Sequence, residues 1–558
     1  MRLNGVRNVL ATVSAAALLT AASGAMAQAS DPLAQLLVKK GLLTSSDLNG
    51  VASRDQLTNL LVRKGLISPQ DAATLPPPPP PTVVYAAPPP GTALAPAPLI
   101  AAGPAGSPFA FRIGKVDFQV GGFLDFETII RSSNTGNVTA TNFGAVPFSN
   151  TVAGHQRDLR LTAQNTRFDL KATTNFWGND ITAYGEMDFN GSDSSNVFVN
   201  SNSHTARLRL AYVDVMRGPF ELQAGQLWSW VTPNRFGVSA DPNDVWTTYN
   251  FDENHIVGLN WARQAAIRAI WHPNPNLALG LSVENPDQYI GSGEVIFPFA
   301  FNAQLGTQFD AGNNSAAPNF LPDFIPKVAF DANPMGMRLH AEALGLFRGY
   351  RIAVLPVGGT GFDHDTLITK AGGVNANMEV IPGFMRLVGG GMYGEGIGRY
   401  AGALGPDVVV KSIDTGAGTF NAQLSPVTGA SGVVGMEFMI TPKDLFAAYA
   451  GASFFHSNNF LDVTNPVPGR IAGFGGPNSP NSANKLIKEL SFDYIHTVWQ
   501  DPQYGKLAAG FQFSTVLRKP WFVPAGAPKD AIDHMGFFDL RYSLPAPVPA
   551  PPAPPPPP

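Results

Sequence analysis

The 558-residue chain contains no cysteine, which excludes disulfides, thiolate metal sites and a lipid anchor on an N-terminal cysteine. Charged residues make up only 14% of the chain and the formal net charge is −4, so the basic face of a nucleic-acid-binding protein is not expected. After residue 27 there is no uninterrupted apolar run of about 18 residues, so no membrane-spanning helix is predicted. The histidines form no metal-spaced cluster, and we expect no metal, no cofactor and no catalytic residues.

The first 27 residues have the layout of a secretory signal peptide. Arg2 and Arg7 give a positive start, residues 9–22 are small and apolar, and residues 25–27 form an Ala-Met-Ala cleavage site. The segment is too short and too rich in alanine to be a retained spanning helix. We therefore predict an exported protein whose mature chain begins after residue 27.

Residues 109–544 show a period of two in hydrophobicity. In one example, Val116, Phe118 and Val120 alternate with the polar Asp117 and Gln119. Successive side chains of a strand point to opposite faces, so one face of each such segment is apolar and the other polar. Recurring segments of about ten residues with this pattern are typical of a transmembrane β-barrel. The predicted fold class is all-β, an antiparallel transmembrane barrel in the bacterial outer membrane.

The length of this region predicts a wide barrel. At 24 to 30 residues per strand and connection, about 430 residues give roughly 14 to 18 strands, and bacterial single-chain barrels are even-numbered. A barrel of that width encloses water, whereas about eight strands would fill their own interior. Residues 132–154, 287–322 and 460–484 are the longest predicted insertions, and long connections of such barrels face outward from the cell.

Three further segments flank the barrel region. Residues 28–75 contain a repeat in which 36–44 resembles 60–68, and each copy predicts a short helix ending in basic residues before a glycine. We interpret this segment as a helical periplasmic module. Residues 76–108 are rich in proline and alanine and predict an extended linker, and residues 545–558 form a proline-rich tail.

Charged residues at positions of inward parity are the candidate pore lining. They could form facing rows of opposite charge that select permeants, or simply pair with neighbours along the wall, and for any single residue we favour pairing. The candidates are Arg160, Arg167, Arg207, Arg209, Arg268, Arg338, Glu186 and Asp188.

Trp228, Trp230 and Tyr542 are interpreted as members of an aromatic girdle at the membrane interface. A sugar-binding platform is the less favoured reading of the two tryptophans.

Four segments resemble the early strands of DcaP-like porins. The resemblance covers about residues 158–284, and the rest of the barrel region matches in pattern alone. The segments that carry it are residues 158–171 (DLRLTAQNTRFDLK), 183–189 (AYGEMDF), 208–213 (LRLAYV) and 225–230 (GQLWSW).

The resemblance implies a homotrimer of sixteen-stranded outer-membrane barrels that take up small, preferentially anionic organic solutes such as dicarboxylates. It makes Arg160, Arg167, Arg207 and Arg209 the leading candidates for contacting a carboxylate, because the planar guanidinium can bind one through two hydrogen bonds. Two features depart from the family pattern: a helical repeat replaces its N-terminal coiled coil, and a proline tail follows Tyr542, where family barrels end on an aromatic residue read by the insertion machinery.

The function expected from these observations is a passive porin, not an enzyme. Its expected partners are other copies of the chain, outer-membrane lipid and the barrel-insertion machinery, with peptidoglycan as a further candidate. The alternative is a structural or adhesive barrel that tethers the outer membrane to the cell wall through residues 28–75. A barrel-embedded hydrolase has no recognisable catalytic constellation to support it.

Overall fold

The structure is a computed structural model, and it divides the chain into two compact units, Met1–Ala97 and Pro98–Pro558. Of the first unit, only Val62 and Arg63, which are helical, and Lys64 in a turn are described. The predicted signal peptide, helical module, linker and tail lie almost wholly outside the described residues. The same is true of residues 28–75 as the segment of the alternative function, a tether to the cell wall. The described residues are 62–64, 101–102, 109–191, 204–240, 248–312, 316–402 and 405–545.

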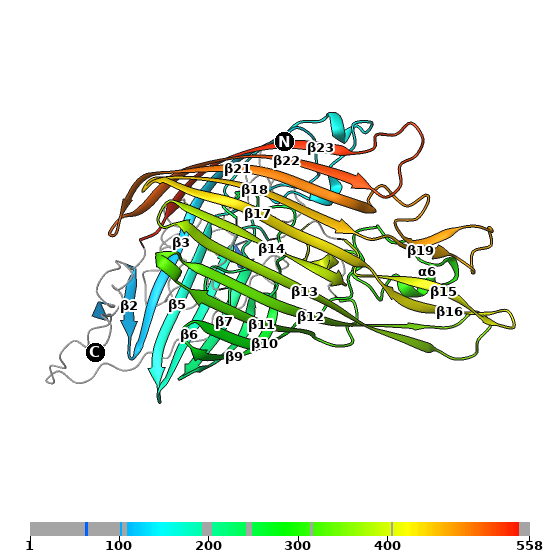
Figure 1. Cartoon of the computed structure of the whole chain (residues 1–558), viewed down its shortest axis with the longest axis horizontal. Helices are drawn as coiled ribbons and strands as arrows, with labels where there is room; N and C mark the ends of the chain where they lie inside the picture. The colour runs from blue at the N-terminus through cyan, green and yellow to red at the C-terminus, as the bar shows by residue number, and fades with distance from the viewer. Residues whose placement is uncertain are drawn as a thin grey trace. The chain divides into compact units, whose positions relative to one another are not determined.

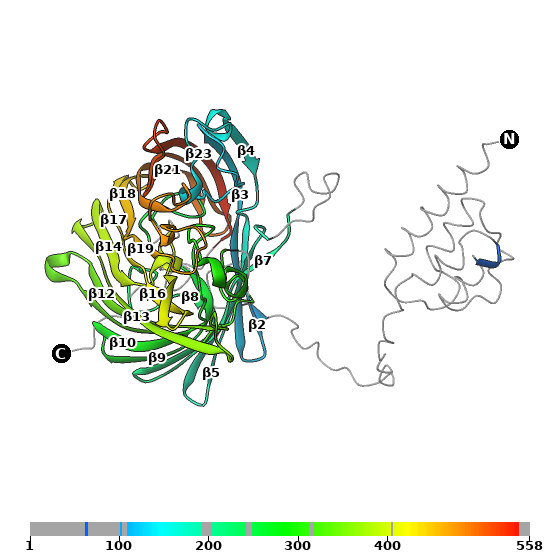
Figure 2. The same ribbon diagram turned by 90° about the vertical axis from the view of Figure 1, so that its right-hand side faces the viewer.

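The second unit contains a closed antiparallel barrel of 16 strand positions within its described residues. Figure 2 views the ring of strands from one end. Two short strands, β4 and β5, share one position. The wall strands are β3 (Val116–Arg131), β4 (Asp158–Thr162), β5 (Arg167–Phe176), β6 (Asn179–Asp188), β7 (Arg207–Arg217), β8 (Phe220–Trp228), β9 (Arg263–Asn274), β10 (Leu277–Glu284), β11 (Asp323–Ala332), β12 (Leu339–Val354), β13 (Asp363–Ile381), β14 (Met385–Glu395), β17 (Thr428–Thr441), β18 (Asp444–Phe455), β21 (Asn484–Asp501), β22 (Gly505–Pro520) and β23 (Ala531–Ser543).

Pairing between the first and last wall strands closes the barrel. β3 pairs with β23 from Phe123↔Ser543 to Arg131↔Met535. Closure gives each wall strand two neighbours, which is how a sheet can satisfy its backbone hydrogen bonds inside a bilayer. The predicted fold class, an antiparallel barrel of about 16 strands, is confirmed.

Side chains on the wall alternate as the sequence predicts. On β3, Leu124 and Ile130 are 48% and 54% exposed on the outer face, whereas Asp125 and Glu127 are 5% and 1% exposed on the inner face. The outer face is therefore apolar and the inner face polar, as a barrel in lipid around a polar interior requires. No helix of the described residues is long and apolar enough to cross a membrane.

A bulge interrupts the second strand position. β4 pairs with β3 through Thr162↔Glu127, and β5 resumes the pairing at Arg167↔Phe123, so five steps along one strand match four along the other. The apolar residues of the sequence change parity at the same place, from odd at Leu161 to even at Phe168, because one extra residue reverses the faces of all that follow.

Short turns join the strands at one end of the barrel and long connections join them at the other (Figure 1). The wall begins and ends at the short-turn end, where β1 (Ala101–Ala102) and β2 (Ala110–Ile113) extend the edge of β3. The connection 229–262 was not among the three predicted long insertions, although it is longer than 132–154 and 460–484.

Within the connections lie small elements, most of them at the long-connection end. These are η2 (Phe143–Ala145), η3 (Ala153–His155), η4 (Phe299–Phe301), α6 (Asn302–Leu305), η5 (Pro334–Gly336), η6 (Gly398–Tyr400), β15 (Val408–Gly416), β16 (Thr419–Pro426), β19 (Asn458–Leu461) and β20 (Ile471–Phe474).

We predict that Gly122→Ala destabilises the barrel. Gly122 lies beside the bulge with φ +122°, and an added Cβ would overlap the carbonyl oxygen of Arg167. We expect a loss of about 2 kcal/mol in the free energy of unfolding, measured from the urea midpoint of the folded band in cold gel electrophoresis. Gly185→Ala is the control, because nothing lies within 4 Å of its added Cβ. Equal urea midpoints for Gly122→Ala and Gly185→Ala would contradict the predicted clash at Gly122.

Candidate functional site

The connection between β8 and β9, residues 229–262, folds into the barrel; we call it the inward loop. Its described parts are 229–240 and 248–262. Backbone lies against backbone where it meets the far wall: a Cβ added to Gly258 would overlap the carbonyl oxygen of Gly432 on β17, and one added to Gly451 on β18 would overlap that of Val257. The inward loop therefore crosses the lumen and narrows it.

Wall carboxylates accept hydrogen bonds from the backbone of the inward loop. Glu284 on β10 accepts from Trp230 N–H, and Glu489 on β21 accepts from Val257 N–H, both at 2.9 Å. Asp331 on β11 accepts from Gly237 N–H, also at 2.9 Å. Buried backbone N–H groups require acceptors, and ionised carboxylates are strong ones.

Side chains add further anchors between the inward loop and the wall. Arg235 donates two hydrogen bonds to Glu437 on β17, at 2.9 and 3.0 Å. Asn250 donates to Ser491 on β21 at 2.6 Å and to Asp493 at 3.2 Å. Many acidic residues of the inner wall from β10 to β21 therefore hold the loop and are not available to select permeants.

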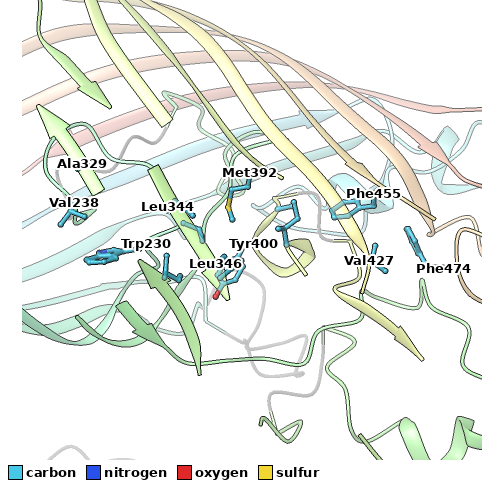
Figure 3. Packing of buried hydrophobic residues seen from close by; sticks show 14 of the residues in the cluster. Trp230, Val238, Ala329, Leu344, Leu346, Met392, Tyr400, Val427, Phe455 and Phe474 are labelled. Carbon is cyan, nitrogen blue, oxygen red and sulfur yellow. The ribbon is translucent and has the colours of Figure 1, made fainter. Parts of the chain in front are cut away.

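Trp230 and Trp228 do not belong to an outer girdle, and this prediction is wrong for both. Trp230 is completely buried, packs inside the barrel near Ala329 and Leu344 (Figure 3), and has the guanidinium of Arg268 5.4 Å from its ring centroid. Trp228 is 4% exposed and packs against the inward loop, with its ring centroid 6.5 Å from that of His255. Trp228 is the last residue of β8 and Trp230 is the second residue of the inward loop, so the two buried rings hold the start of the loop against the wall.

Tyr542 lies on the outer face at the short-turn end, opposite Leu124 and 6.1 Å from Trp499 between ring centroids. Other exposed aromatic side chains occupy the same end of the barrel, where a membrane interface would attract amphipathic rings. They are Phe176, Trp177, Phe220, Trp271, Phe384, Trp499 and Tyr504.

Charged residues gather around a cavity of 210 Å³ between the inward loop and the wall from β3 to β8, which we call the arginine cavity. Three arginines, Arg167, Arg209 and Arg541, line it together with three carboxylates, Glu186, Asp252 and Glu253. The remaining lining residues are Phe123, Asn165, Trp228, Thr248, Tyr249, Asn250, Phe251, His255 and Ile495.

Five of the predicted residues form one ion-pair network on β5, β6 and β7. Arg209 donates to Glu186 at 2.6 Å and to Asp188 at 2.7 Å, and Arg207 donates to Asp188 at 2.6 Å. Arg167 lies 3.6 Å from Glu186. The opposite charges therefore share one wall and pair with their neighbours, and they do not form facing rows across the lumen, which was the less favoured of the two interpretations.

The other predicted arginines lie away from the cavity lining. Arg160 pairs with Asp158 at 3.0 Å, and Arg268 is buried beside Glu284 at 3.5 Å. Arg338 is 79% exposed at the short-turn rim and lies 3.9 Å from Glu379. Inward parity is correct for Arg268, but parity does not reveal that a loop covers it.

Sequence reasoning missed Arg541, Glu253 and His255 as lining residues. Arg541 and Arg167 flank the ring of Phe123, with guanidinium carbons 4.3 and 5.1 Å from its centroid. The inward parity of Arg541 on the last strand was a usable signal. No local pattern marks Glu253 or His255, because they lie on an irregular connection.

Burial changes the protonation of two cavity-lining groups on the inward loop, Glu253 and His255. It raises the pKa of Glu253 above the ordinary value, against the opposing effect of Arg207. Burial, with Arg209 and Arg263 nearby, lowers the pKa of His255 to about 3. His255 is therefore neutral at physiological pH, and Glu253 takes up a proton more readily than an exposed glutamate.

We predict that Arg235→Ala loosens the inward loop. The change leaves Glu437 with a buried carboxylate and without its two hydrogen bonds from the loop. Amide hydrogen exchange in residues 248–262 should become about tenfold faster or more, measured by mass spectrometry in detergent. Arg338→Ala, at the exposed rim, is the matched control and should leave this exchange unchanged. Unaltered exchange in Arg235→Ala would refute the anchoring role.

Comparison with known proteins identifies the fold. No protein-family profile matches the chain, and no curated protein matches its sequence. The crystal structure of the outer membrane channel DcaP of Acinetobacter baumannii is similar, with a TM-score of 0.51 and 16% identity over 77% of this chain and 97% of that chain. OprB of Pseudomonas putida matches with a TM-score of 0.41 and 10% identity over 76% of this chain and 94% of that chain. The resemblance noted in the sequence is thus confirmed as a likeness of structure, and the chain has the fold of the DcaP channel.

Proposed function

We propose that the protein is an outer-membrane porin, a passive channel for small hydrophilic solutes that prefers anionic organic acids. The barrel is too wide to be filled by its own wall side chains, and its apolar outer face suits lipid. The inward loop packs apolar residues such as Trp230 and Leu259 against the wall and leaves a polar cavity on its other side. A narrow polar passage through a wide barrel is the arrangement expected of a selective diffusion channel.

The observation that carries the anion preference is the state of Arg167. Its side chain is 26% exposed and donates no hydrogen bond to a described residue, and its buried Nε lies 3.6 Å from Glu186, too far for a hydrogen bond. Most of the cavity carboxylate oxygens, in contrast, accept hydrogen bonds: Glu186 from Arg209, and Asp252 Oδ1 from Thr141 N–H at 3.0 Å, while Asp252 Oδ2 is buried without a partner. An entering carboxylate therefore meets a partly exposed guanidinium that has no hydrogen-bond acceptor of its own.

Phe123 gives the available donor a fixed position. The ring holds the guanidinium groups of Arg167 and Arg541 on the cavity wall, and Asp125 pairs with Arg541 at 3.3 Å. A planar guanidinium held against a ring keeps its N–H edge free for a carboxylate. We assign Arg167 the binding role and Arg541 a supporting electrostatic role.

Orientation and partners follow from the same proposal. Long connections of outer-membrane barrels face outward, so the short turns and both ends of the wall would lie in the periplasm. The export signal, a homotrimeric assembly, recognition by the barrel-insertion machinery and contact of the N-terminal segment with peptidoglycan are proposed along with it.

We predict that Arg167→Gln weakens anion preference. Purified protein in planar bilayers should conduct, and its reversal potential under a salt gradient should report an anion-to-cation permeability ratio above one. Loss of the available donor should lower this ratio by about threefold or more, consistent with a charge-assisted hydrogen bond. Arg338→Gln removes the same charge at the exposed rim and should have no such effect. Folded protein without conductance would refute the porin, and cation preference would refute the anion assignment alone.

We predict that anion preference rises as the pH falls from 7 to 5. Burial raises the pKa of Glu253, so this carboxyl becomes neutral on acidification and the passage gains net positive charge, while His255 stays neutral until about pH 3. Reversal potentials measured across this range should show the change in wild type, whereas Glu253→Gln should give a shallower profile. The remaining slope comes from the cavity-lining Asp252, because burial raises the pKa of that carboxyl too. Glu379→Gln at the rim is the control. A profile of wild-type slope in Glu253→Gln would contradict this role.

A further inference from the structure

Lysines project from the outer face of the barrel at the long-connection end of β21 and β22. Lys488 and Lys519 are exposed, and their chain neighbours Glu489 and Arg518 are buried on the inner face. The register pairs Lys488 with Leu517 and Leu486 with Lys519. The two lysines are therefore diagonal neighbours on one face, with Cβ atoms about 7–8 Å apart.

These lysines mark the edge of the apolar outer band. Toward the barrel middle, the next outward position on β21 is Leu490, 47% exposed, and Leu517, Thr515 and Phe513 follow on β22, the last of them 43% exposed. A lysine on the lipid-facing side of a barrel is costly at the bilayer centre and tolerated near the interface. Because Lys519 is one residue from the end of β22, the pair fits the interface at the long-connection end.

A third lysine lies beside the pair on an aromatic support. Lys485 is the extra residue of a bulge at the start of β21, and its Nζ lies 4.7 Å from the ring centroid of Trp521. Trp521 is held by its own indole N–H, which donates to the carbonyl oxygen of Phe455 at 3.1 Å. The ammonium group of Lys485 is thus directed over this ring.

Asp530 precedes β23, next to the Arg518↔Ala531 pair, and is therefore an acid near Lys519 in the register. Lys485, Lys488 and Lys519 nevertheless form no ion pair with any described residue, in contrast to Arg209 of the arginine cavity. The outward positions around them, in the half of the wall next to the long connections, hold apolar residues, threonine or histidine. On β18, β21, β22 and β23 these are Ala450, Ala452, Phe454, Leu486, Leu490, Phe513, Thr515, Leu517, Ile532, His534 and Gly536.

We propose that Lys485, Lys488 and Lys519 bind the phosphate groups of a phosphate-bearing glycolipid in the outer leaflet. The acyl chains would lie on the apolar face below, along Leu490, Phe513 and Leu517. Three cations at the rim of an apolar wall, none of them in an ion pair with a described residue, match a ligand with an anionic head and apolar tails. The proposal rests on the outer-membrane location and orientation given under the proposed function.

The test is lipid binding to the full-length protein in detergent, followed by native mass spectrometry. The probe is diphosphoryl lipid A, compared with the same lipid after removal of its phosphates. Wild type should bind the phosphorylated form about tenfold or more tightly, and Lys488→Gln/Lys519→Gln should abolish this difference. The matched control, Lys115→Gln/Lys443→Gln, removes two exposed lysines from the short-turn end and should behave as wild type. Heat-dependent gel mobility confirms that each variant is folded.

Three results would overturn the proposal. Equal binding of the two lipid forms by wild type would exclude recognition of phosphate. Displacement of the lipid by millimolar inorganic phosphate alone would assign the lysines to a free anion. A change of oligomeric mass in the Lys488→Gln/Lys519→Gln variant, with lipid binding intact, would assign them to contact between copies. Conductance is measured on the same preparations, so phosphate-dependent lipid binding without conductance refutes the porin and not the lipid site.

Discussion

The buried inward loop requires hydrogen-bond acceptors, and this requirement accounts for the carboxylates on the inner wall of the barrel. The inward loop carries backbone N–H groups into the lumen, where each must be paired or hydrated. The wall meets this need with carboxylates on separate strands, among them Glu284, Asp331 and Glu489. These charges bind the loop to the wall between β10 and β21, and the arginine cavity lies on the other side of the loop, along β3 to β8 and β23.

This arrangement separates two uses of charge within one polar lumen. Carboxylates on the anchoring side are taken up by the loop, and on the passage side Asp188 and Glu186 are taken up by Arg207 and Arg209. On this side the guanidinium of Arg167 is left without a hydrogen-bond acceptor among the described residues, and Asp252 keeps one buried oxygen without a donor. Selectivity in such a lumen depends less on the number of charges than on which hydrogen-bonding groups the fold has left unused.

The outer face obeys a different constraint, because lipid offers few partners to a charged group. Exposed aromatic rings lie on it at the short-turn end, and Lys488 and Lys519 lie toward the long-connection end. Each strand thus has one face toward the polar interior and one toward lipid. On β21, Glu489 holds the inward loop, while its neighbour Lys488 projects from the outer face. The period of two in a strand makes this possible.

The sequence by itself determined the class of the fold, the face of each wall residue on β3 and the extra residue between Leu161 and Phe168, because alternation is a local property that survives in any barrel. It also indicated Arg167, Arg209 and Glu186, which lie on regular strands. Only the tertiary structure decided that Trp228 and Trp230 face inward, that Arg268 is covered and that Glu253 and His255 line the passage. These outcomes depend on the path of an irregular loop and on contacts with strands far away in the chain, and no periodic pattern encodes either of them.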